Sequence, residues 1–399
     1  DLTMKIAIFT EYYYPFISGV VTHIESLKDE LEKKGHEVLI VTTDPHSKTH
    51  YIKDGVLYCP AKGVKKIYGY GVTIPYSHHR LKYLRDFNPD LIHIQTEFTV
   101  GIFGLWAAKK LNKPVVYTLH TLYDQYTFYV VPEMFNFIAK PIVYKYLGVI
   151  AKHADEITSP SPKGRVLLEK GGIHKPVTII PNATDLHLFL PENVNRDKVR
   201  QIRRKYGFKD GDVVLCFCGR LGKEKSIDVL IEYFAKSSEK CDKYKLLIMG
   251  DGPENESLKQ LARDTGFADR IFFTGKVDHE EISAYYYACD LYATASVTEA
   301  NSISALEAGA SGLLMLQKLD EGNKYQITQG ENGYTFKDFE EFDLRLRDYT
   351  ALSIDERKQV RDRVMASSRK YGPEEFVKNI LKVYNRAICD RQQENAAEL

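Results

Sequence analysis

The sequence has almost no net charge, because 55 lysines and arginines stand against 54 aspartates and glutamates. A chain without an overall positive charge gives no general electrostatic reason to bind nucleic acid. It also lacks an apolar run of the roughly 18 residues that a membrane-spanning helix needs. Its first residues lack the basic, apolar and small-residue regions of a secretory signal. These absences lead us to expect a cytoplasmic protein with no nucleic-acid partner.

Cysteine is scarce, and the six cysteines form no CxxC pair or other metal-binding spacing. We expect buried thiols in a reducing compartment. The one D-x-D pattern, Asp210-Gly211-Asp212, stands before a strand-like run, where a turn is expected rather than a metal-diphosphate site. The sequence therefore predicts neither a metal ion nor another cofactor.

Short apolar runs such as "KIAIFT" (5–10) alternate with longer amphipathic segments along the chain. This alternation predicts the α/β fold class, with parallel, doubly wound sheets. The pattern restarts after a polar segment, which predicts two Rossmann-like domains at 1–193 and 194–371. A last amphipathic helix within 372–399 is expected to pack back on the first domain. Because ligands bind outside the carboxyl ends of parallel strands, we expect the active site in a cleft between the two facing domains.

Two residues of the first half stand where a strand is expected to end. Gly19 precedes a helical pattern, and a glycine there lets backbone N–H groups approach an anion. A simple turn is the alternative. His120 ends the run "PVVYTLH", where it can reach a ligand, although a hydrogen-bonded structural histidine also fits this position. Tyr123 and Tyr126 follow it and are further candidates on the acceptor side.

The second half begins with a strand-like run that ends in "CGRLGKEKSIDVLI". Arg220 and Lys225 flank a glycine just before a helical pattern. Two cations at the start of a helix suit a diphosphate, because the charges and the helix dipole both favour an anion. A solvated charged turn is the alternative.

The segment "SVTEANSISALEAGASG" (296–312) carries two glutamates eight residues apart. Glu299 precedes a helical pattern that is expected to start near Asn301, and Glu307 lies within that pattern. The amides of Asn301, Ser302 and Ile303 are expected to point at a ligand. Glycosidase carboxylates face each other across the scissile bond, whereas these two follow one loop and helix. A carboxylate also suits a ribose diol, so this segment favours binding of a nucleotide sugar.

Two segments could contact a membrane. Segment 61–90 carries six lysines and arginines among tyrosines and aliphatic residues, a composition that can lie on an anionic bilayer. Its candidate membrane residues are Lys65, Lys66, Arg80 and Lys82. Segment 127–150 is apolar and rich in aromatic residues, and it could line an acyl-chain groove. A solvated basic face and a core helix are the respective alternatives.

These motifs resemble those of glycosyltransferase family 4, whose members have two Rossmann-like domains in the GT-B arrangement. The marks are the spacing of Glu299 and Glu307, "GRL-x-x-x-K" at 219–225 and "GDGP" at 250–253. Within the family the chain looks most like bacterial glucosyltransferases that act on diacylglycerol. The local marks of that group are "YYYPFISGVVTHI" (12–24), "IHIQTEF" (92–98), "LHTLYDQY" (119–126) and "IIPNATDLHLF" (179–189).

The resemblance implies a role for each candidate. His120 would touch the transferred sugar and stabilise the transition state, and Glu299 would bind the hydroxyls of that sugar. Glu307 would bind the nucleotide ribose. The diphosphate would lie over Gly19 and the helix-start amides, neutralised by Arg220 and Lys225. The family's usual donor is a UDP-sugar, commonly UDP-glucose in this group, used without a metal and with retention of configuration.

We therefore expect a retaining hexosyltransferase that moves glucose from UDP-glucose to diacylglycerol or a glycolipid, bound peripherally to the inner face of the cell membrane. Transfer to a soluble, polyprenyl-linked or protein acceptor is one alternative. A catalytically silent subunit that binds nucleotide sugars is another, because Asn301 and Ser302 replace an aromatic residue or Gln and a Gly that are common in the family. Leu313-Leu314 and Ala183 are further departures from the family pattern.

Overall fold

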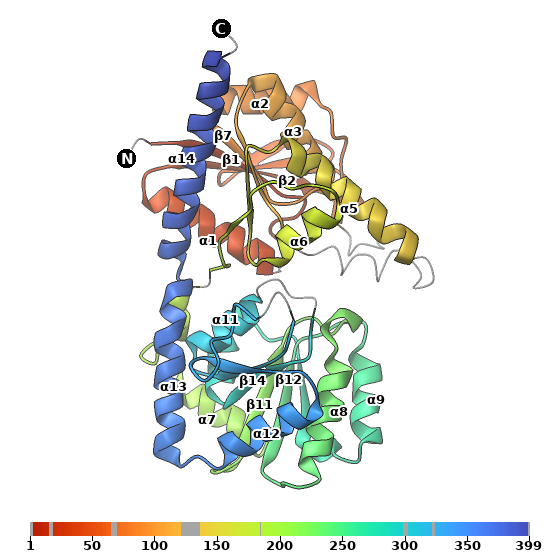
Figure 1. The fold of residues 1–399 in the computed structure, drawn as a ribbon, viewed down its shortest axis with the longest axis vertical. Coiled ribbons are helices and arrows are strands. Elements are labelled where there is room, and N and C mark those ends of the chain that lie inside the picture. The colour runs from red at the N-terminus through yellow and green to blue at the C-terminus, as the bar shows by residue number, and fades with distance from the viewer. Residues whose placement is uncertain are drawn as a thin grey trace. The chain divides into compact units, whose positions relative to one another are not determined.

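The chain divides into two compact units (Figure 1). This computed structural model describes residues 3–15, 19–64, 70–120, 136–183, 185–297, 302–320 and 324–397. One unit combines Asp1–Asn182 with Pro373–Leu399, and the other is Ala183–Gly372. Each unit is built on a parallel sheet covered by helices, which confirms the predicted α/β class with two Rossmann-like domains.

An eight-stranded sheet forms the first unit, in the order β10-β9-β8-β7-β1-β2-β4-β3. All its pairs are parallel except that of β3 with β4. The chain adds strands on one side of β1 and then on the other, so the order reverses between β1 and β7. The strands, with the separate pair β5 and β6, are β1 Lys5–Phe9, β2 Glu37–Asp44, β3 Tyr51–Lys53, β4 Val56–Pro60, β5 Lys62–Val64, β6 Tyr70–Val72, β7 Leu91–Ile94, β8 Val115–Thr118, β9 Glu156–Ser159 and β10 Thr178–Ile179.

Helix α1 of the first unit buries one apolar stripe. In α1 that stripe is Val21, Ile24, Leu27 and Leu31, spaced three and four residues apart as a half-buried helix requires. The helices are α1 Gly19–Lys33, α2 His78–Phe87, α3 Thr99–Leu111, α5 Asn136–His153, α6 Lys163–Lys170 and α14 Pro373–Ala397. Among the residues described, no helix combines the length and the apolar character needed to span a membrane.

Six parallel strands form the second unit, in the order β13-β12-β11-β14-β15-β16. The order reverses between β11 and β14, as it does between β1 and β7 in the first unit. In such sheets the reversal opens a crevice at the carboxyl ends of the two strands, and ligands bind there. The strands are β11 Val213–Cys218, β12 Tyr244–Met249, β13 Ile271–Gly275, β14 Leu291–Thr294, β15 Leu314–Lys318 and β16 Gly333–Phe336.

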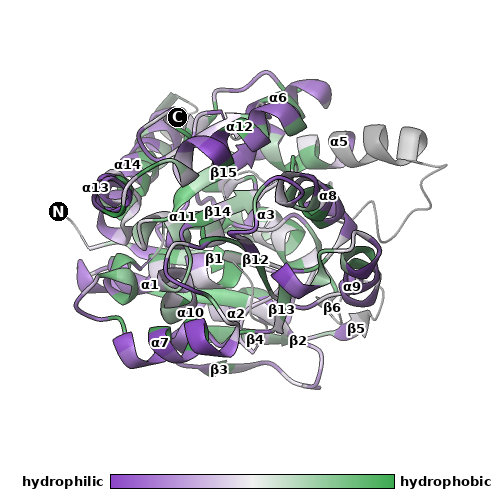
Figure 2. Cartoon of the chain, turned by 90° about the horizontal axis from the view of Figure 1, so that it is seen from below, coloured by the Kyte–Doolittle hydropathy of each residue, from purple (hydrophilic) through white to green (hydrophobic). Residues whose placement is uncertain are grey.

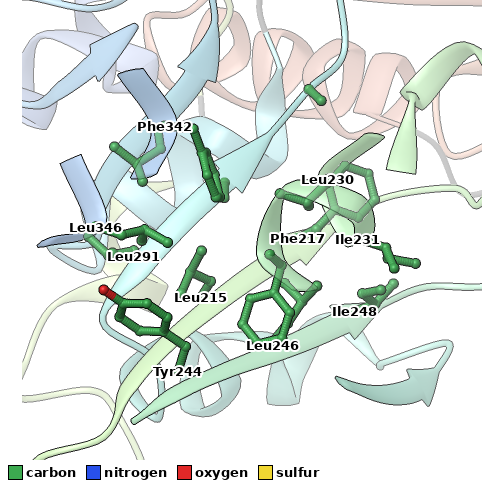
Figure 3. Packing of buried hydrophobic residues seen from close by; sticks show 14 of the residues in the cluster. Leu215, Phe217, Leu230, Ile231, Tyr244, Leu246, Ile248, Leu291, Phe342 and Leu346 are labelled. Carbon is green, nitrogen blue, oxygen red and sulfur yellow. The ribbon is translucent and has the colours of Figure 1, made fainter. Parts of the chain in front are cut away.

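Both faces of the second sheet are buried, which explains why its strands are continuous apolar runs. Leu215 and Phe217 of β11 point to one face, where they pack with Leu230 of α8 and Phe342 of α12 (Figure 3). The alternate residue Cys216 belongs to the cluster on the other face. The helices of the unit are α7 Arg196–Lys205, α8 Ile227–Ser238, α9 Asn255–Asp264, α10 His279–Tyr287, α11 Ile303–Ala310, α12 Phe339–Thr350 and α13 Ile354–Ser368, with short 3-10 turns η3 Leu186–Phe189, η4 Lys223–Lys225, η5 Ala268–Arg270 and η6 Arg369–Tyr371.

The boundary between the units lies earlier than the sequence suggested. Residues 183–193, assigned to the first domain from the sequence, belong to the second unit. The reason is Phe189, which is fully buried and whose carbonyl accepts a hydrogen bond from the Tyr287 hydroxyl at 2.7 Å. The polar helix α7 follows, largely purple in Figure 2, and buries only Val199 and Ile202.

The C-terminal helix α14 belongs to the first unit, where it lies along α1 and the ends of β7, β8 and β9 (Figure 1). Val377, Ile380 and Val383 are fully buried against that unit. Arg386 binds the carboxylate of Glu156 with two nitrogens, at 3.2 and 3.0 Å. The helix thus connects the end of the chain to the sheet that carries His120.

Candidate active site

Apart from Arg80 and Lys82, the candidate residues that can be placed follow strands at or beside the reversal of strand order in each unit. In the second unit Arg220 and Lys225 follow β11, and Ser302 begins the cap of the helix after β14. In the first unit α1 begins at Gly19, after β1, and His120 follows β8, the strand beside β7. The sequence placed all of these residues at carboxyl strand ends, and the structure agrees.

His120 is buried, with only 5% of its surface exposed. Its Nε2 lies 2.5 Å from Oε1 of Gln95, and its ring meets that of His23 edge to face at a centroid distance of 5.7 Å. Burial, together with the neighbouring His23 and His93, holds the pKa of His120 well below its usual range. The imidazole is therefore neutral at pH 7, and it can exchange hydrogen bonds with a sugar but carries no positive charge.

A buried polar network continues behind His120. The amide nitrogen of Gln95 lies 3.2 Å from Nε2 of His93, and the Tyr384 hydroxyl of α14 lies 2.7 Å from Nδ1 of the same ring. Thr118 lies 2.7 Å from that Nε2 and 2.6 Å from Thr158. Sequence reasoning missed this network. The available signal was a histidine and a glutamine at alternate positions of "IHIQTEF", on one face of an otherwise apolar strand.

Two buried carboxyl groups follow strands of the first sheet, Glu11 after β1 and Glu97 after β7. Glu11 accepts hydrogen bonds from the Val100 amide at 2.6 Å and the Thr99 hydroxyl at 3.1 Å, at the start of α3. Burial raises its pKa to about 8. Glu97 accepts a hydrogen bond from the Tyr117 hydroxyl at 2.7 Å, and burial raises its pKa as well. Glu11 therefore ties the loop after β1 to the start of α3.

The "GRL" and "GDGP" motifs of the second unit hold each other in place. The Leu221 amide donates to the Asp251 carbonyl at 3.0 Å, and the Leu221 carbonyl accepts from the Glu254 amide at 2.9 Å. Gly250 has φ +133° and is so close to Gly219 that a Cβ would lie 1.8 Å from its carbonyl oxygen. The two loops therefore form one rigid backbone that presents Arg220, while Asp251 has a structural role.

The start of α11 and Glu307 are the remaining candidates of the second unit. Ser302 caps α11, its hydroxyl accepting from the Ala305 amide at 3.3 Å, so the helix begins at Ile303 and Glu307 lies little more than one turn inside it. Glu307 is 6% exposed, and its Oε2 accepts from the Tyr286 hydroxyl at 3.3 Å. Burial raises its pKa to about 7, although the Tyr286 hydroxyl opposes this shift. A ligand that donates to Glu307 would favour its charged form.

Lys225 lies beside the loop that follows β14. It closes η4, and the carbonyl of its neighbour Glu224 accepts from the Ser296 hydroxyl at 3.3 Å. The loops after β11 and β14 therefore meet at the reversal point of the sheet. The diphosphate roles of Arg220 and Lys225 remain predictions.

The prediction of a basic membrane-facing patch is wrong for Arg80. This residue is 2% exposed, because its guanidinium donates to the Ile74 carbonyl at 2.9 Å and the Thr73 hydroxyl at 2.8 Å. It also lies 4.8 Å from the centroid of the Phe103 ring. Lys82, in contrast, is exposed on α2. Glu299, Asn301, Lys65, Lys66, Tyr123 and Tyr126 lie outside the described residues.

The D-x-D pattern forms a turn, as expected. The Lys209 amide donates to Oδ2 of Asp212 at 2.8 Å, and Gly211 has φ +90°. Within the described part of the chain, no three His, Cys, Asp or Glu side chains are grouped so that they could hold a metal ion.

Comparison with known proteins matches each unit to a family. Residues 17–188 match "Glycosyltransferase Family 4", and residues 198–363 match "Glycosyl transferases group 1". The chain is 32% identical to an alpha-monoglucosyldiacylglycerol synthase of Streptococcus pneumoniae, over 81% of this chain and 72% of that protein. A second such synthase, from Acholeplasma laidlawii, is also 32% identical, over 85% of this chain and 86% of that protein.

Solved structures agree in fold. The crystal structure of HepE from Anabaena in complex with UDP-glucose superposes with a TM-score of 0.71, at 16% identity, and covers 96% of this chain and 99% of its own. The sequence matches and the structural superposition both cover the two units of the chain. The chain is a glycosyltransferase and belongs to glycosyltransferase family 4.

Proposed function

We propose that this glycosyltransferase moves glucose from UDP-glucose to diacylglycerol or a related glycolipid, with retention of the anomeric configuration and without a metal ion. The observation that carries the proposal is the arrangement at the reversal point of the second sheet. A loop with Arg220 and Lys225 follows β11, and the start of α11 with Glu307 follows β14. Cations, helix-start amides and a carboxylate suit the diphosphate and the ribose of one nucleotide.

The donor is held by the second unit. Arg220 and Lys225 neutralise the diphosphate, the amides of Ser302 and Ile303 point at it, and Glu307 accepts from the ribose hydroxyls. The cations take the place that a metal ion has in other transferases. Glu299 binds hydroxyls of the transferred sugar. HepE, whose fold the chain shares, was crystallised with UDP-glucose, and this supports a UDP-sugar donor.

The first unit contributes His120 and Gly19. His120 touches the transferred sugar as a neutral imidazole, and the backbone at Gly19 lies under the diphosphate. The acceptor hydroxyl bonds to C1 of glucose on the face from which UDP leaves with the electron pair of the broken C1–O bond. A phosphate oxygen of UDP takes the acceptor proton. The protein acts by positioning and by electrostatic stabilisation rather than by forming a covalent intermediate.

The acceptor proposal rests on the relatives and on one surface of the first unit. The two synthases named above make an alpha-linked monoglucosyldiacylglycerol by their names, and UDP-glucose is itself alpha-linked, so retention follows for the same product. Val72, Ile74 and Tyr76 are 40, 71 and 60% exposed, and the Tyr76 ring lies 5.9 Å from that of Trp106. Exposed apolar and aromatic side chains, followed along the chain by the exposed cation Lys82, suit the interface of an anionic bilayer, at the inner face of the cell membrane.

A screen of UDP-sugars against lipid and soluble acceptors tests the proposal. We expect glucosyl transfer from UDP-glucose to diacylglycerol in anionic vesicles, and the same rate in the presence of EDTA. Transfer only to a soluble, polyprenyl-linked or protein acceptor would contradict the lipid acceptor while leaving the donor intact. Release of no UDP with any donor would identify a catalytically silent subunit.

A further inference from the structure

Gln95 lies between two buried imidazoles and bonds to both. Its side-chain oxygen lies 2.5 Å from Nε2 of His120, and its side-chain nitrogen lies 3.2 Å from Nε2 of His93. An amide oxygen can only accept a hydrogen bond and an amide nitrogen can only donate one. In this orientation His120 carries its proton on Nε2, and its other nitrogen, Nδ1, keeps a lone pair.

Gln95 is held in place by its backbone and by burial. Its backbone amide donates to the Phe9 carbonyl at 2.8 Å, which anchors it to β1. Its side chain is 1% exposed, so no water competes for the amide. With Nε2 of His93 accepting from that amide at 3.2 Å and from the Thr118 hydroxyl at 2.7 Å, its Nδ1–H donates to the Tyr384 hydroxyl at 2.7 Å. A rotation of the Gln95 amide by half a turn would reverse the proton positions on both imidazoles.

Burial keeps both rings neutral. His93 is fully buried and its pKa is lowered to about 3, while the pKa of His120 is also lowered, in both cases mainly because burial disfavours the charged form. A neutral imidazole has one donor and one acceptor, so the tautomer decides which of the two faces a ligand. With Nε2–H bound to Gln95, Nδ1 of His120 can accept a hydrogen bond from a sugar hydroxyl.

We propose that Gln95 is a positioning residue that fixes the ring and the Nε2–H tautomer of His120, and that His93 and Tyr384 of the C-terminal helix hold Gln95 in turn. The inference rests on the proposed function, in which His120 contacts the transferred sugar. It gives α14 a role in the reaction: the helix contributes a hydroxyl that reaches His120 through two side chains.

Kinetics of four single variants and one double variant test the role of Gln95. We expect Gln95→Leu to lower kcat roughly tenfold or more, with KM for UDP-glucose changed by less than about twofold, because the ring is misplaced while the donor site stays intact. Tyr384→Phe is expected to lower kcat in the same direction by a smaller factor. In a His120→Ala background, Gln95→Leu should cause no further loss. The matched control is His36→Leu, which removes a different buried ring hydrogen bond, from the Met4 amide at 3.1 Å, and should leave kcat unchanged.

Nitrogen NMR of the histidine rings gives a readout that a purely structural role would not move. The full chain is labelled with ¹⁵N-histidine, and the His120 signals are assigned by their absence in His120→Ala. We expect an Nε2–H pattern in the wild type and a shift toward the other tautomer in Gln95→Leu. Gln95→Glu keeps an acceptor toward His120 and should keep the wild-type pattern, which covers the case in which Gln95→Leu does not fold.

Three results would overturn the positioning role. The first is an unchanged kcat in Gln95→Leu. The second is an equal factor of kcat loss from Gln95→Leu in the wild type and in the His120→Ala background. The third is a His120 tautomer pattern that is the same in the wild type and in Gln95→Leu. Full activity in His120→Ala would instead contradict the proposed contact of His120 with the sugar. In that case the NMR pattern would still decide whether Gln95 sets the tautomer.

Discussion

Protonation of Glu307 should control how tightly the second unit binds UDP. Its carboxyl group is buried on α11 next to the Tyr286 hydroxyl, and burial raises its pKa to about 7. A carboxylate that accepts from the ribose hydroxyls must be ionised. Because the ionised fraction of an acid increases with pH, the affinity for UDP should increase from pH 6 to pH 8.

The size of the effect follows from the pKa. With a pKa near 7, the ionised fraction falls about tenfold between pH 8 and pH 6, which corresponds to a roughly tenfold weaker affinity, or about 1.4 kcal/mol. Glu307→Gln cannot ionise and loses a charge-assisted hydrogen bond worth about 1.5 to 3 kcal/mol, so its affinity at pH 8 should be about 10- to 150-fold weaker.

Isothermal titration calorimetry with UDP at pH 6, 7 and 8 measures both effects. The phosphate of UDP titrates in the same range, so the informative quantity is the ratio of the wild-type and Glu307→Gln affinities at each pH. We expect that ratio to be largest at pH 8 and to shrink about tenfold at pH 6. Glu256→Gln, an exposed position on α9, is the matched control and should bind like the wild type. A ratio that is constant across pH, or equal affinities of wild type and Glu307→Gln, would refute the ribose contact.

Three further predictions concern stability and the membrane. Burial raises the pKa of Glu11 to about 8, so between about pH 4.5 and 8 the native state holds a proton that the unfolded state releases, and the stability of the first unit should fall as pH rises. The expected loss in the free energy of unfolding is on the order of 4 kcal/mol, and Glu11→Gln should reduce it. Urea unfolding at pH 5 and pH 8 measures the loss for both proteins. An equal loss in the wild type and in Glu11→Gln would contradict the prediction. Gly250→Ala should cost at least about 2 kcal/mol in thermal unfolding, because its Cβ would collide with the Gly219 carbonyl, whereas Gly266→Ala has open space and should cost only about 1 kcal/mol. Replacing Ile74 and Tyr76 by serine should weaken co-sedimentation with anionic vesicles, while Ile52→Ser, another exposed apolar position, should not; equal effects would exclude a specific membrane contact.

The fold was predictable because its signals are local. Buried parallel strands are apolar runs, and their alternation with amphipathic helices appears directly in the sequence. The sequence located the boundary between the units less accurately than it located the strands and helices. The boundary was placed after residue 193 because the polar and charged segment 192–212 looks like a connection. Only the burial of Phe189 beside Tyr286 shows that residues 183–193 already belong to the second unit.

The positions of the candidate residues in the fold were predictable where a residue follows a strand, and less so where burial decides. His120 and Glu307 were identified by position along the chain, whereas Arg80 was assigned to a surface because charged residues are usually exposed. Its guanidinium is buried because the Ile74 carbonyl, the Thr73 hydroxyl and the His50 ring surround it in the fold, which residue type alone does not reveal. The pairing of His93 with Tyr384 joins residues 291 positions apart, and no local pattern encodes it.

The anomeric configuration of the product distinguishes retention from inversion. Purified protein is incubated with UDP-glucose and diacylglycerol in anionic vesicles, and the anomeric proton coupling of the isolated glycolipid is measured by NMR. We expect a monoglucosylated lipid with an alpha linkage. A beta linkage would contradict retention, and the absence of any glucosylated lipid while UDP-glucose is consumed would contradict the lipid acceptor.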